Sequence, residues 1–234
     1  MREGLIVIDG VDASGKHTQS ELLCKRLARE GYAVKRIQFP DYDQPSSALI
    51  KMYLAGEFGT DAAAVNAYAA SSFYAVDRYA SYKKFWKTEL DAGKIVISDR
   101  YTTSNAIHQM IKLPKTQWDD YLTWLYQYEY ELLGIPRPDL VLFMDMPVSV
   151  SLRLMDERAK KEHREKDIHE ANRNYLTACY ESAAYAADKF GWVRIHCLDE
   201  QNKLKKAEQI SDEIVRLVKA YKAAGGISSV KPGI

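Results

Sequence analysis

Short apolar stretches alternate with longer amphipathic ones along the chain. Five stretches rich in β-branched residues predict strands at Leu5–Asp9, Val34–Phe39, Ile95–Ser98, Leu140–Met144 and Val193–Cys197. The sequences LIVID and LVLFM are apolar almost throughout, which is typical of central parallel strands covered on both faces. Helix-length stretches separate the strands, as in repeated βαβ units. The pattern therefore predicts an α/β fold in three layers, with helices on both faces of a five-stranded parallel sheet.

One amphipathic stretch is unusually aromatic. Between residues 118 and 132 apolar side chains recur at helical spacing, and the same stretch carries Trp124, Tyr126 and Tyr130 on other faces. A single core rarely uses that much aromatic surface, so either a dimer contact or a helix enclosed within the fold explains it. The residues with helical spacing are Trp118, Tyr121, Leu122, Leu125, Tyr128 and Leu132.

Composition narrows the class of protein. The 234 residues, 47% of them hydrophobic, are enough for one core, and we expect a single domain over residues 1–222 followed by a tail at 223–234. The 33 basic residues against 32 acidic ones argue against a nucleic-acid partner. Three scattered cysteines predict reduced thiols and a cytoplasmic location. No apolar stretch approaches the length of a membrane span, so we expect no membrane partner.

The strongest chemical signal follows the first predicted strand. The sequence GVDASGK matches the phosphate-binding loop G-x-x-x-x-G-K, and a predicted helix begins inside GKHTQ. In such a loop the backbone N–H groups converge on one anion and the lysine neutralises the β- and γ-phosphates. The sequence therefore predicts ATP binding by Gly10, Val11, Asp12, Ala13, Ser14, Gly15, Lys16, His17 and Thr18.

One position departs from that loop pattern. The residue after the lysine normally supplies a hydroxyl to Mg²⁺, but here it is His17, and Thr18 comes one residue late. Neutral imidazole is a poor ligand for hard Mg²⁺. The sequence therefore predicts that Mg²⁺ is held mainly through water and the phosphates, or that the site is impaired.

A second chemical signal ends the third predicted strand. IVIS is followed directly by Asp99 and Arg100. An acid at the carboxyl end of a neighbouring strand can orient Mg²⁺ and its water beside a phosphate loop. The arginine offers a planar fork to a phosphate. A structural salt bridge would explain the pair on its own, but beside a phosphate loop we interpret Asp99 as the metal-site acid.

Together these motifs resemble the thymidylate kinase family. The resemblance rests on GVDASGKHTQ, FPDYD, YAVDR, DRYTTSNAIHQ, PDLVLFMDMP and KDIHEANRNYL, which follow the family's order over roughly residues 4–215. It implies a kinase that moves a phosphoryl group from ATP to a nucleoside monophosphate, with dTMP as the favoured acceptor. It also implies a homodimer.

The resemblance assigns roles on the acceptor side. Asp12 matches the acid near the sugar 3′-hydroxyl and the metal, and Arg100 the arginine on the acceptor phosphate. The Phe-Pro pair that lines the monophosphate site is Phe39 and Pro40, followed here by Asp-Tyr-Asp in place of the usual Arg or Gly. Ser104 is the serine of the family's DRY-x-x-S motif.

The resemblance also assigns the base-binding residues. Tyr74 matches the aromatic residue on which the base stacks, and Arg78, one helical turn later, the arginine that reaches a base carbonyl. Asn105 matches an asparagine that bonds the base edge in some members, although a capping role would also suit it. His108 stands where Tyr or Phe commonly guards the sugar 2′ position, which leaves deoxyribose selection open.

A charged run, RAKKEHREK, begins at residue 158. Alone it would be read as a solvated helix face, but in the resembled family this region, here about 153–170, is a lid that closes over ATP. Members without an arginine in the phosphate loop carry catalytic cations in the lid, and this loop has none. The transferring group needs positive charge at its equatorial oxygens. The candidates are Arg153, Arg158, Lys161 and Arg164.

Two other readings stay open at this point. His108 leaves room for another nucleotide or deoxynucleoside kinase of the same fold, and His17 for a nucleotide sensor without turnover. Fold cannot separate these readings, because function lies in the site.

Overall fold

A parallel sheet forms the centre of the computed structural model, which describes residues 4–59, 61, 64–162 and 173–225. Its strands run in the order β2-β3-β1-β4-β5, and every pairing is parallel. The predicted fold class is confirmed, with strand ends that differ by at most one residue from expectation. The strands are β1 (Leu5–Asp9), β2 (Val34–Gln38), β3 (Ile95–Asp99), β4 (Leu140–Asp145) and β5 (Val193–His196).

The register of the sheet gathers the polar strand ends. Ile8 of β1 lies opposite Asp99 of β3, and Gln38 of β2 pairs with the same aspartate. On the other side Asp9 pairs with Phe143 of β4. Since parallel strands end at one edge, the loops after β1, β2 and β3 open onto a common region.

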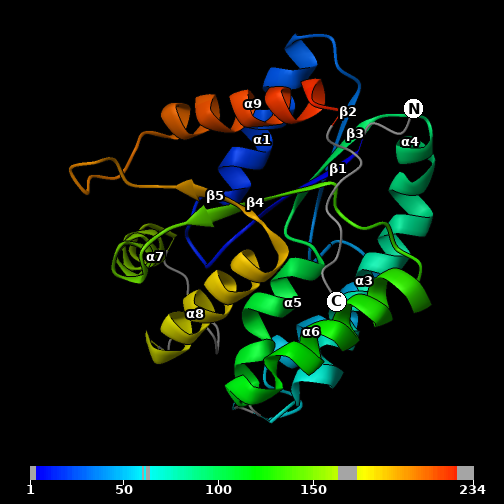
Figure 1. Cartoon of the computed structure of the whole chain (residues 1–234). Helices are drawn as coiled ribbons and strands as arrows, with labels where there is room; N and C mark the ends of the chain where they lie inside the picture. The colour runs from blue at the N-terminus through cyan, green and yellow to red at the C-terminus, as the bar shows by residue number, and fades with distance from the viewer. Residues whose placement is uncertain (1–3, 60, 62–63, 163–172, 226–234) are drawn as a thin grey trace.

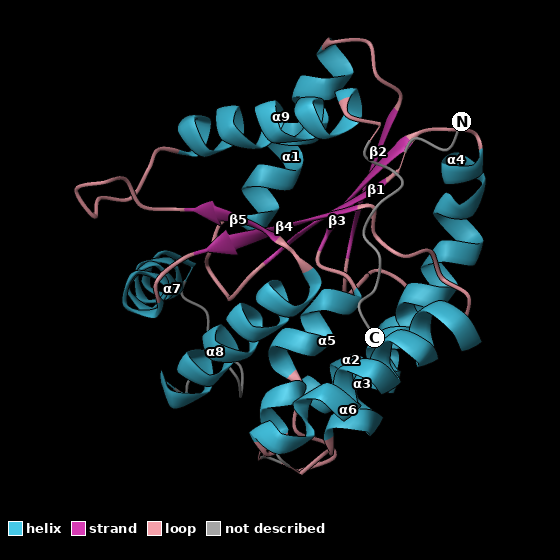
Figure 2. Ribbon diagram, viewed as in Figure 1, coloured by secondary structure: helices cyan, strands magenta, loops and turns pink. Residues whose placement is uncertain are grey.

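Helices cover both faces of the sheet (Figures 1 and 2). α1 (Lys16–Arg29) and α9 (Ala207–Ala223) cover one face, and α5 (Thr102–His108) and α8 (Arg173–Phe190) lie against the other. α3 (Ala67–Ser81) and α6 (Trp118–Tyr126) pack beyond α5. The remaining elements are α2 (Ala48–Leu54), α4 (Lys87–Asp91), α7 (Val148–Glu162), the 3₁₀ turns η1 (Pro45–Ser47), η3 (Met110–Lys112) and η4 (Lys115–Gln117), and the π-helical turns η2 (Tyr82–Trp86) and η5 (Gln127–Leu132).

A separate apolar core lies on each side of the sheet. Leu23 and Leu27 of α1 pack with Ile214 of α9 against one face. Against the other face, Phe143 packs with Tyr121 of α6 and residues of α5 and α8. Full burial of each such side chain contributes about 1.5–3 kcal/mol. These cores make the sheet a rigid support for the loops at its edge.

In the aromatic stretch 118–132, only part of the expected helical face is buried. Trp118, Leu122 and Leu125 are buried as predicted, but Leu132 is 73% exposed, and Glu129 and Tyr130 are buried in its place. The prediction for the last turn is wrong because α6 continues into the π-helical turn η5, whose wider turn shifts the buried face.

Candidate active site

The phosphate loop forms a cradle between β1 and α1. Gly10 has φ 155° and Gly15 has φ 89°, and a Cβ at Gly10 would lie 2.9 Å from the carbonyl oxygen of Met144. No side chain caps α1, so its first N–H groups remain available to an anion. Among the described residues, the buried hydroxyl of Ser14 has no hydrogen-bond partner. These features suit a bound phosphate chain.

Lys16 is the cation of this cradle. Its side chain is buried, and its Nζ donates to the carbonyl oxygen of Val11 at 2.8 Å. Burial, reinforced by the charge of Arg100, lowers the pKa of Lys16 to about 8. The lysine is therefore held in the loop but incompletely compensated, and an arriving polyanion would supply the missing negative charge.

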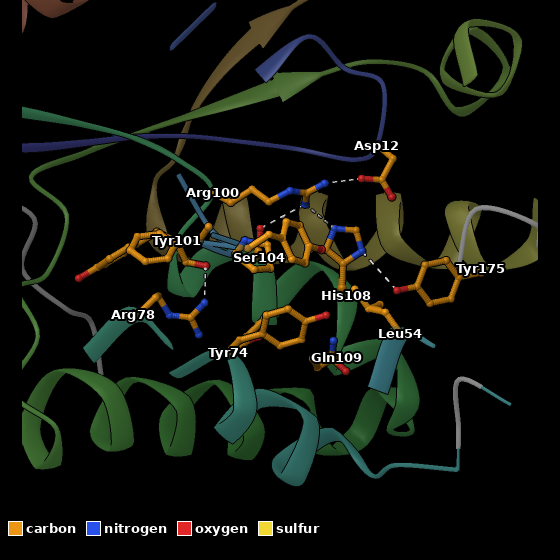
Figure 3. Close-up of a pocket in the computed structure, with 14 residues that line it drawn as sticks. Asp12, Leu54, Tyr74, Arg78, Arg100, Tyr101, Ser104, His108, Gln109 and Tyr175 are labelled. Atoms are coloured by element: carbon orange, nitrogen blue, oxygen red, sulfur yellow. Dashed lines mark hydrogen bonds and ion pairs between the residues drawn. The ribbon is translucent and has the colours of Figure 1, made fainter. Parts of the chain in front are cut away.

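An ion pair joins the phosphate loop to the start of α5 (Figure 3). Arg100, held at a left-handed φ of 66°, donates to Asp12 Oδ1. Burial opposes ionisation of Asp12, but Arg100 outweighs it and holds the pKa of the carboxyl well below its usual range. Burial likewise opposes the charge of Arg100, and Asp12 more than offsets it, so the pKa of the guanidinium rises. Both groups are charged in the free protein.

Asp9 links the phosphate loop to α5 through hydrogen bonds. Its buried carboxylate accepts from the backbone N–H of Gly10 at 2.8 Å and from the hydroxyl of Thr103 at 2.5 Å. The hydroxyl of Ser104 donates to it at 2.8 Å. The base of the phosphate loop is therefore bonded directly to the first turn of α5.

Where the usual loop supplies a hydroxyl to Mg²⁺, this chain has a cluster of three polar side chains: His17, Arg36 and Asp99. Arg36 Nη2 lies 2.8 Å from His17 Nδ1 and 3.6 Å from Asp99 Oδ2, while His17 Nδ1 is 3.3 Å from the same oxygen. Because arginine only donates, it occupies the lone pair of that imidazole nitrogen. Of these three side chains, only Asp99 carries an oxygen that can ligate Mg²⁺. In the described part of the chain, no group of three or more metal-binding side chains occurs.

A pocket of about 620 Å³, including its open mouth, extends from this junction toward α3. A pocket lined by aromatic side chains and a few convergent polar groups is typical of a small-ligand site. The structure brings together every substrate residue expected from the sequence. These residues are Phe39, Pro40, Tyr74, Arg78, Arg100, Ser104, Asn105 and His108.

The far end of the pocket is a buried polar network. Arg78 is 1% exposed and donates two hydrogen bonds to Glu129, at 2.7 Å from Nε and 2.6 Å from Nη2. Burial opposes its charge, and Glu129 more than compensates, which raises the pKa of Arg78. Asn105 Nδ2 donates to the same carboxylate at 3.1 Å and to the carbonyl oxygen of Ser71 at 3.2 Å.

His108 lies between Arg100 and Tyr175 in the pocket (Figure 3). Its Nε2 is 3.0 Å from Arg100 Nη1 and must accept, because arginine only donates. Its Nδ1 then carries the proton of the neutral ring and lies 3.3 Å from Tyr175 Oη, with the two rings stacked. His108 is therefore a spacer between Arg100 and Tyr175.

Comparisons with known proteins agree with this geometry. The sequence profile of the family described as "Thymidylate kinase" matches residues 8–209. The chain belongs to the thymidylate kinase family. A "Probable thymidylate kinase" from Thermococcus gammatolerans is 33% identical over 218 residues, 91% of this chain and 94% of that protein. The thymidylate kinase of Mycobacterium tuberculosis is 33% identical over 173 residues, 73% of this chain and 77% of that protein.

A solved structure agrees in fold. Thymidylate kinase from Candida albicans matches with a TM-score of 0.66 and 22% identity, over 97% of this chain and 94% of that one. As a family member, the chain is a nucleoside monophosphate kinase, and the reaction of the family is ATP-dependent phosphorylation of dTMP to dTDP.

The expected lid is described only at its beginning. Arg153 lies on α7, exposed and 3.9 Å from Glu157. The side chains of Arg158 and Lys161, and all of Arg164, lie outside the described part of the chain. Where the lid cations lie relative to the phosphate loop therefore stays a prediction.

Several residues of this thymidylate kinase site were not anticipated from the sequence. Gln109 is buried and its Oε1 has no hydrogen-bond partner among the described residues, although it follows His108 directly. Its place after the DRY-x-x-S helix could have signalled it. Tyr42, Leu54, Tyr101 and Tyr175 complete the pocket lining.

Proposed function

We propose that this chain transfers the γ-phosphoryl group of ATP to the phosphate of dTMP. The observation that carries the proposal is the single pocket that joins Tyr74, Arg78 and Asn105 to Asp12 and Arg100. A nucleotide with its base at the first group would present its phosphate to the loop. That phosphate is already anionic, so an in-line attack on the γ-phosphorus needs positioning and positive charge rather than a general base.

On the donor side, Lys16 and the N–H groups of residues 10–18 bind the ATP phosphates. Asp99 is the residue proposed to hold Mg²⁺, which neutralises developing phosphate charge when bound. His17 does not fit as a ligand, because Arg36 occupies its Nδ1.

On the acceptor side, Phe39 and Pro40 line the monophosphate site and Arg100 binds the phosphate. Tyr74 stacks on the base, Arg78 and Asn105 read its edge, and Ser104 and His108 border the sugar. The kinase domain covers residues 1–222, and its lid, about 153–170, supplies positive charge to the transferring group. The candidate cations are Arg153, Arg158, Lys161 and Arg164.

We also propose a homodimer in the cytoplasm. Tyr68, Val76 and Tyr79 are exposed and lie along one stripe of α3, an apolar surface suited to a second copy. All three cysteines are free thiols, as reducing conditions favour. In the described part of the chain, no helix has the length and apolar character to cross a membrane. Sedimentation showing only monomer at high concentration would remove the dimer.

A coupled ADP-release assay with Mg·ATP tests the reaction. The acceptors are dTMP, dUMP, UMP, CMP, AMP and GMP, and we expect dTMP to give the highest kcat/KM. Preference for another monophosphate would make the chain a kinase of different specificity. ATP binding without acceptor-dependent ADP release would favour a nucleotide sensor.

A further inference from the structure

Glu129 is a fully buried acid that none of the proposed catalytic steps uses. It lies on the π-helical turn η5 and is 0% exposed. Its carboxylate accepts from four donors: Arg78 Nε, Arg78 Nη2, Asn105 Nδ2 and Thr102 Oγ1, the last at 2.9 Å. π-helical turns within helices are frequent at functional sites. Two of the three residues it holds line the pocket.

The carboxylate determines what Arg78 can offer a ligand. A guanidinium has five N–H groups, and Arg78 donates three of them within the protein, two to Glu129 and one to the carbonyl oxygen of Tyr101 at 3.3 Å. The bidentate pairing fixes the plane of the group. Arg78 therefore presents only N–H donors to the pocket, in a fixed direction.

The same carboxylate determines the orientation of Asn105. Both N–H groups of the amide are donated, one to Glu129 and one to the carbonyl oxygen of Ser71. Both partners only accept, so the amide cannot be turned round without losing both bonds. Asn105 can therefore offer a ligand only its oxygen, as an acceptor.

We infer that Glu129 is a positioning residue that makes the pocket select thymine or uracil over cytosine. This inference rests on the proposed function, in which Arg78 and Asn105 read the base. Fixed donors beside a fixed acceptor complement a base edge with a carbonyl next to an N–H, which is the O4 and N3–H edge of thymine and uracil. Cytosine carries an amino group and an unprotonated N3 there, so both contacts become mismatched.

Glu129→Gln tests the inference, because the new amide offers one oxygen and one NH₂ in place of two acceptors. If its NH₂ faces Asn105, the asparagine must turn and present its own NH₂ to the pocket. We expect the KM for dTMP to rise about 30-fold with kcat changed less than threefold, and the dTMP:dCMP ratio of kcat/KM to fall about 100-fold. The KM for ATP stays constant. The dTMP:dUMP ratio also stays constant, because both bases share the edge.

Glu131→Gln is the matched control, since Glu131 lies on the same turn but is exposed and pairs with Arg137 at 3.0 Å. It should leave every ratio unchanged. Loss of a buried charge should also lower the Tm of Glu129→Gln, by about 10 °C. If that variant does not fold, Glu129→Asp tests the inference instead. The shorter side chain keeps the charge but cannot reach both Arg78 and Asn105, so the KM for dTMP must rise.

The outcomes separate this inference from the proposed function. If wild-type protein phosphorylates no pyrimidine monophosphate, the proposed function fails and the inference with it. If wild-type protein uses dCMP as well as dTMP, only the inference fails. A folded Glu129 variant that loses Tm but keeps the wild-type KM and dTMP:dCMP ratio would show that Glu129 is purely structural, and it would overturn the inference.

Discussion

The two ends of the pocket are held together in different ways. At the base end, Arg78 and Glu129 are buried and pair bidentately with each other, and their neighbours complete the remaining bonds. At the phosphate end, Arg100 pairs with Asp12 while both stay partly exposed, and the side chain of His17 is 63% exposed. The ion pair at the base end is therefore enclosed by the protein before a ligand arrives, whereas the ion pair at the phosphate end is partly open to solvent and to a ligand.

This difference separates selection from catalysis. A preorganised network loses little conformational entropy on binding, and it rejects a wrong base because the polar groups that face the pocket would stay unpaired beside it. Charges that pair within the free protein must exchange those partners for phosphate oxygens when a nucleotide binds. They therefore stabilise the phosphates fully only in the bound state. Changes at the phosphate end should therefore reduce turnover, while changes at the base end should alter which nucleotide is accepted.

Removing the lysine of the phosphate loop should have the largest effect. Lys16→Met keeps the length of the side chain but removes the charge at the β- and γ-phosphates, and we expect kcat to fall about 1,000-fold in the ADP-release assay. Lys25→Met is the control, because Lys25 is exposed on α1, where it pairs with Glu21 at 3.5 Å. Comparable turnover in the two variants would contradict the role of Lys16.

Replacing the arginine of the phosphate end should have the next largest effect. Arg100→Lys retains the charge but loses the planar fork, so we expect kcat/KM for dTMP to fall about 100-fold. Arg137→Lys, on the surface beside Glu131, should match wild-type kinetics. A change below threefold in Arg100→Lys would indicate that Arg100 does not bind the acceptor phosphate.

Restoring a hydroxyl at the metal position should produce a smaller gain. His17→Ser supplies an oxygen ligand and releases Arg36 from the imidazole, so half-maximal activity should need about fivefold less Mg²⁺. His196→Ser is the matched control, since His196 is a similarly exposed histidine beside Asp145. An unchanged Mg²⁺ requirement would mean that position 17 does not border the metal.

The smallest expected effect is a proton taken up with ATP. The pKa of Lys16 is lowered to about 8 in the free protein, and phosphates beside it raise the pKa again. At pH 8 binding should therefore take up about half a proton, and ATP affinity should fall as the pH rises further. Titration calorimetry in two buffers of different ionisation enthalpy measures this uptake.

Two variants identify the source of that proton. Lys16→Met should abolish the uptake. Lys112→Met should not, although burial also lowers the pKa of Lys112 to about 8, because this lysine donates to Tyr53 and Val65 rather than to the loop. If proton uptake persists in Lys16→Met, a group other than Lys16 binds the proton.

Local patterns were enough to predict the sheet and the phosphate loop. Strand β1 and the loop before Lys16 depend on residues adjacent in sequence, and both occur as expected. The pairing of Arg78 with Glu129 spans 51 positions and depends on how η5 packs against α3, which no local pattern encodes. Glu129 stands between Tyr128 and Tyr130, but Glu131 follows two residues later, so the sequence did not show which of the two acids is buried.

Prediction from the sequence was similarly limited at the proposed metal site. The replacement at His17 is plain from the sequence, but its neighbour Arg36 lies on strand β2, 19 positions away. Parallel pairing of β2 with β3 brings that arginine to Asp99. The motif spacing could therefore show that His17 replaces the usual hydroxyl residue, but not that Arg36 bonds to it.

The pair between Asp12 and Arg100 has a thermodynamic consequence for the two substrates. Asp12 belongs to the loop for the donor nucleotide, and Arg100 belongs to the proposed site of the acceptor phosphate. A ligand that draws either residue out of the pair changes the free energy of binding at the other site. Linkage then requires the dissociation constant of each nucleotide to shift by the same factor when the other is bound.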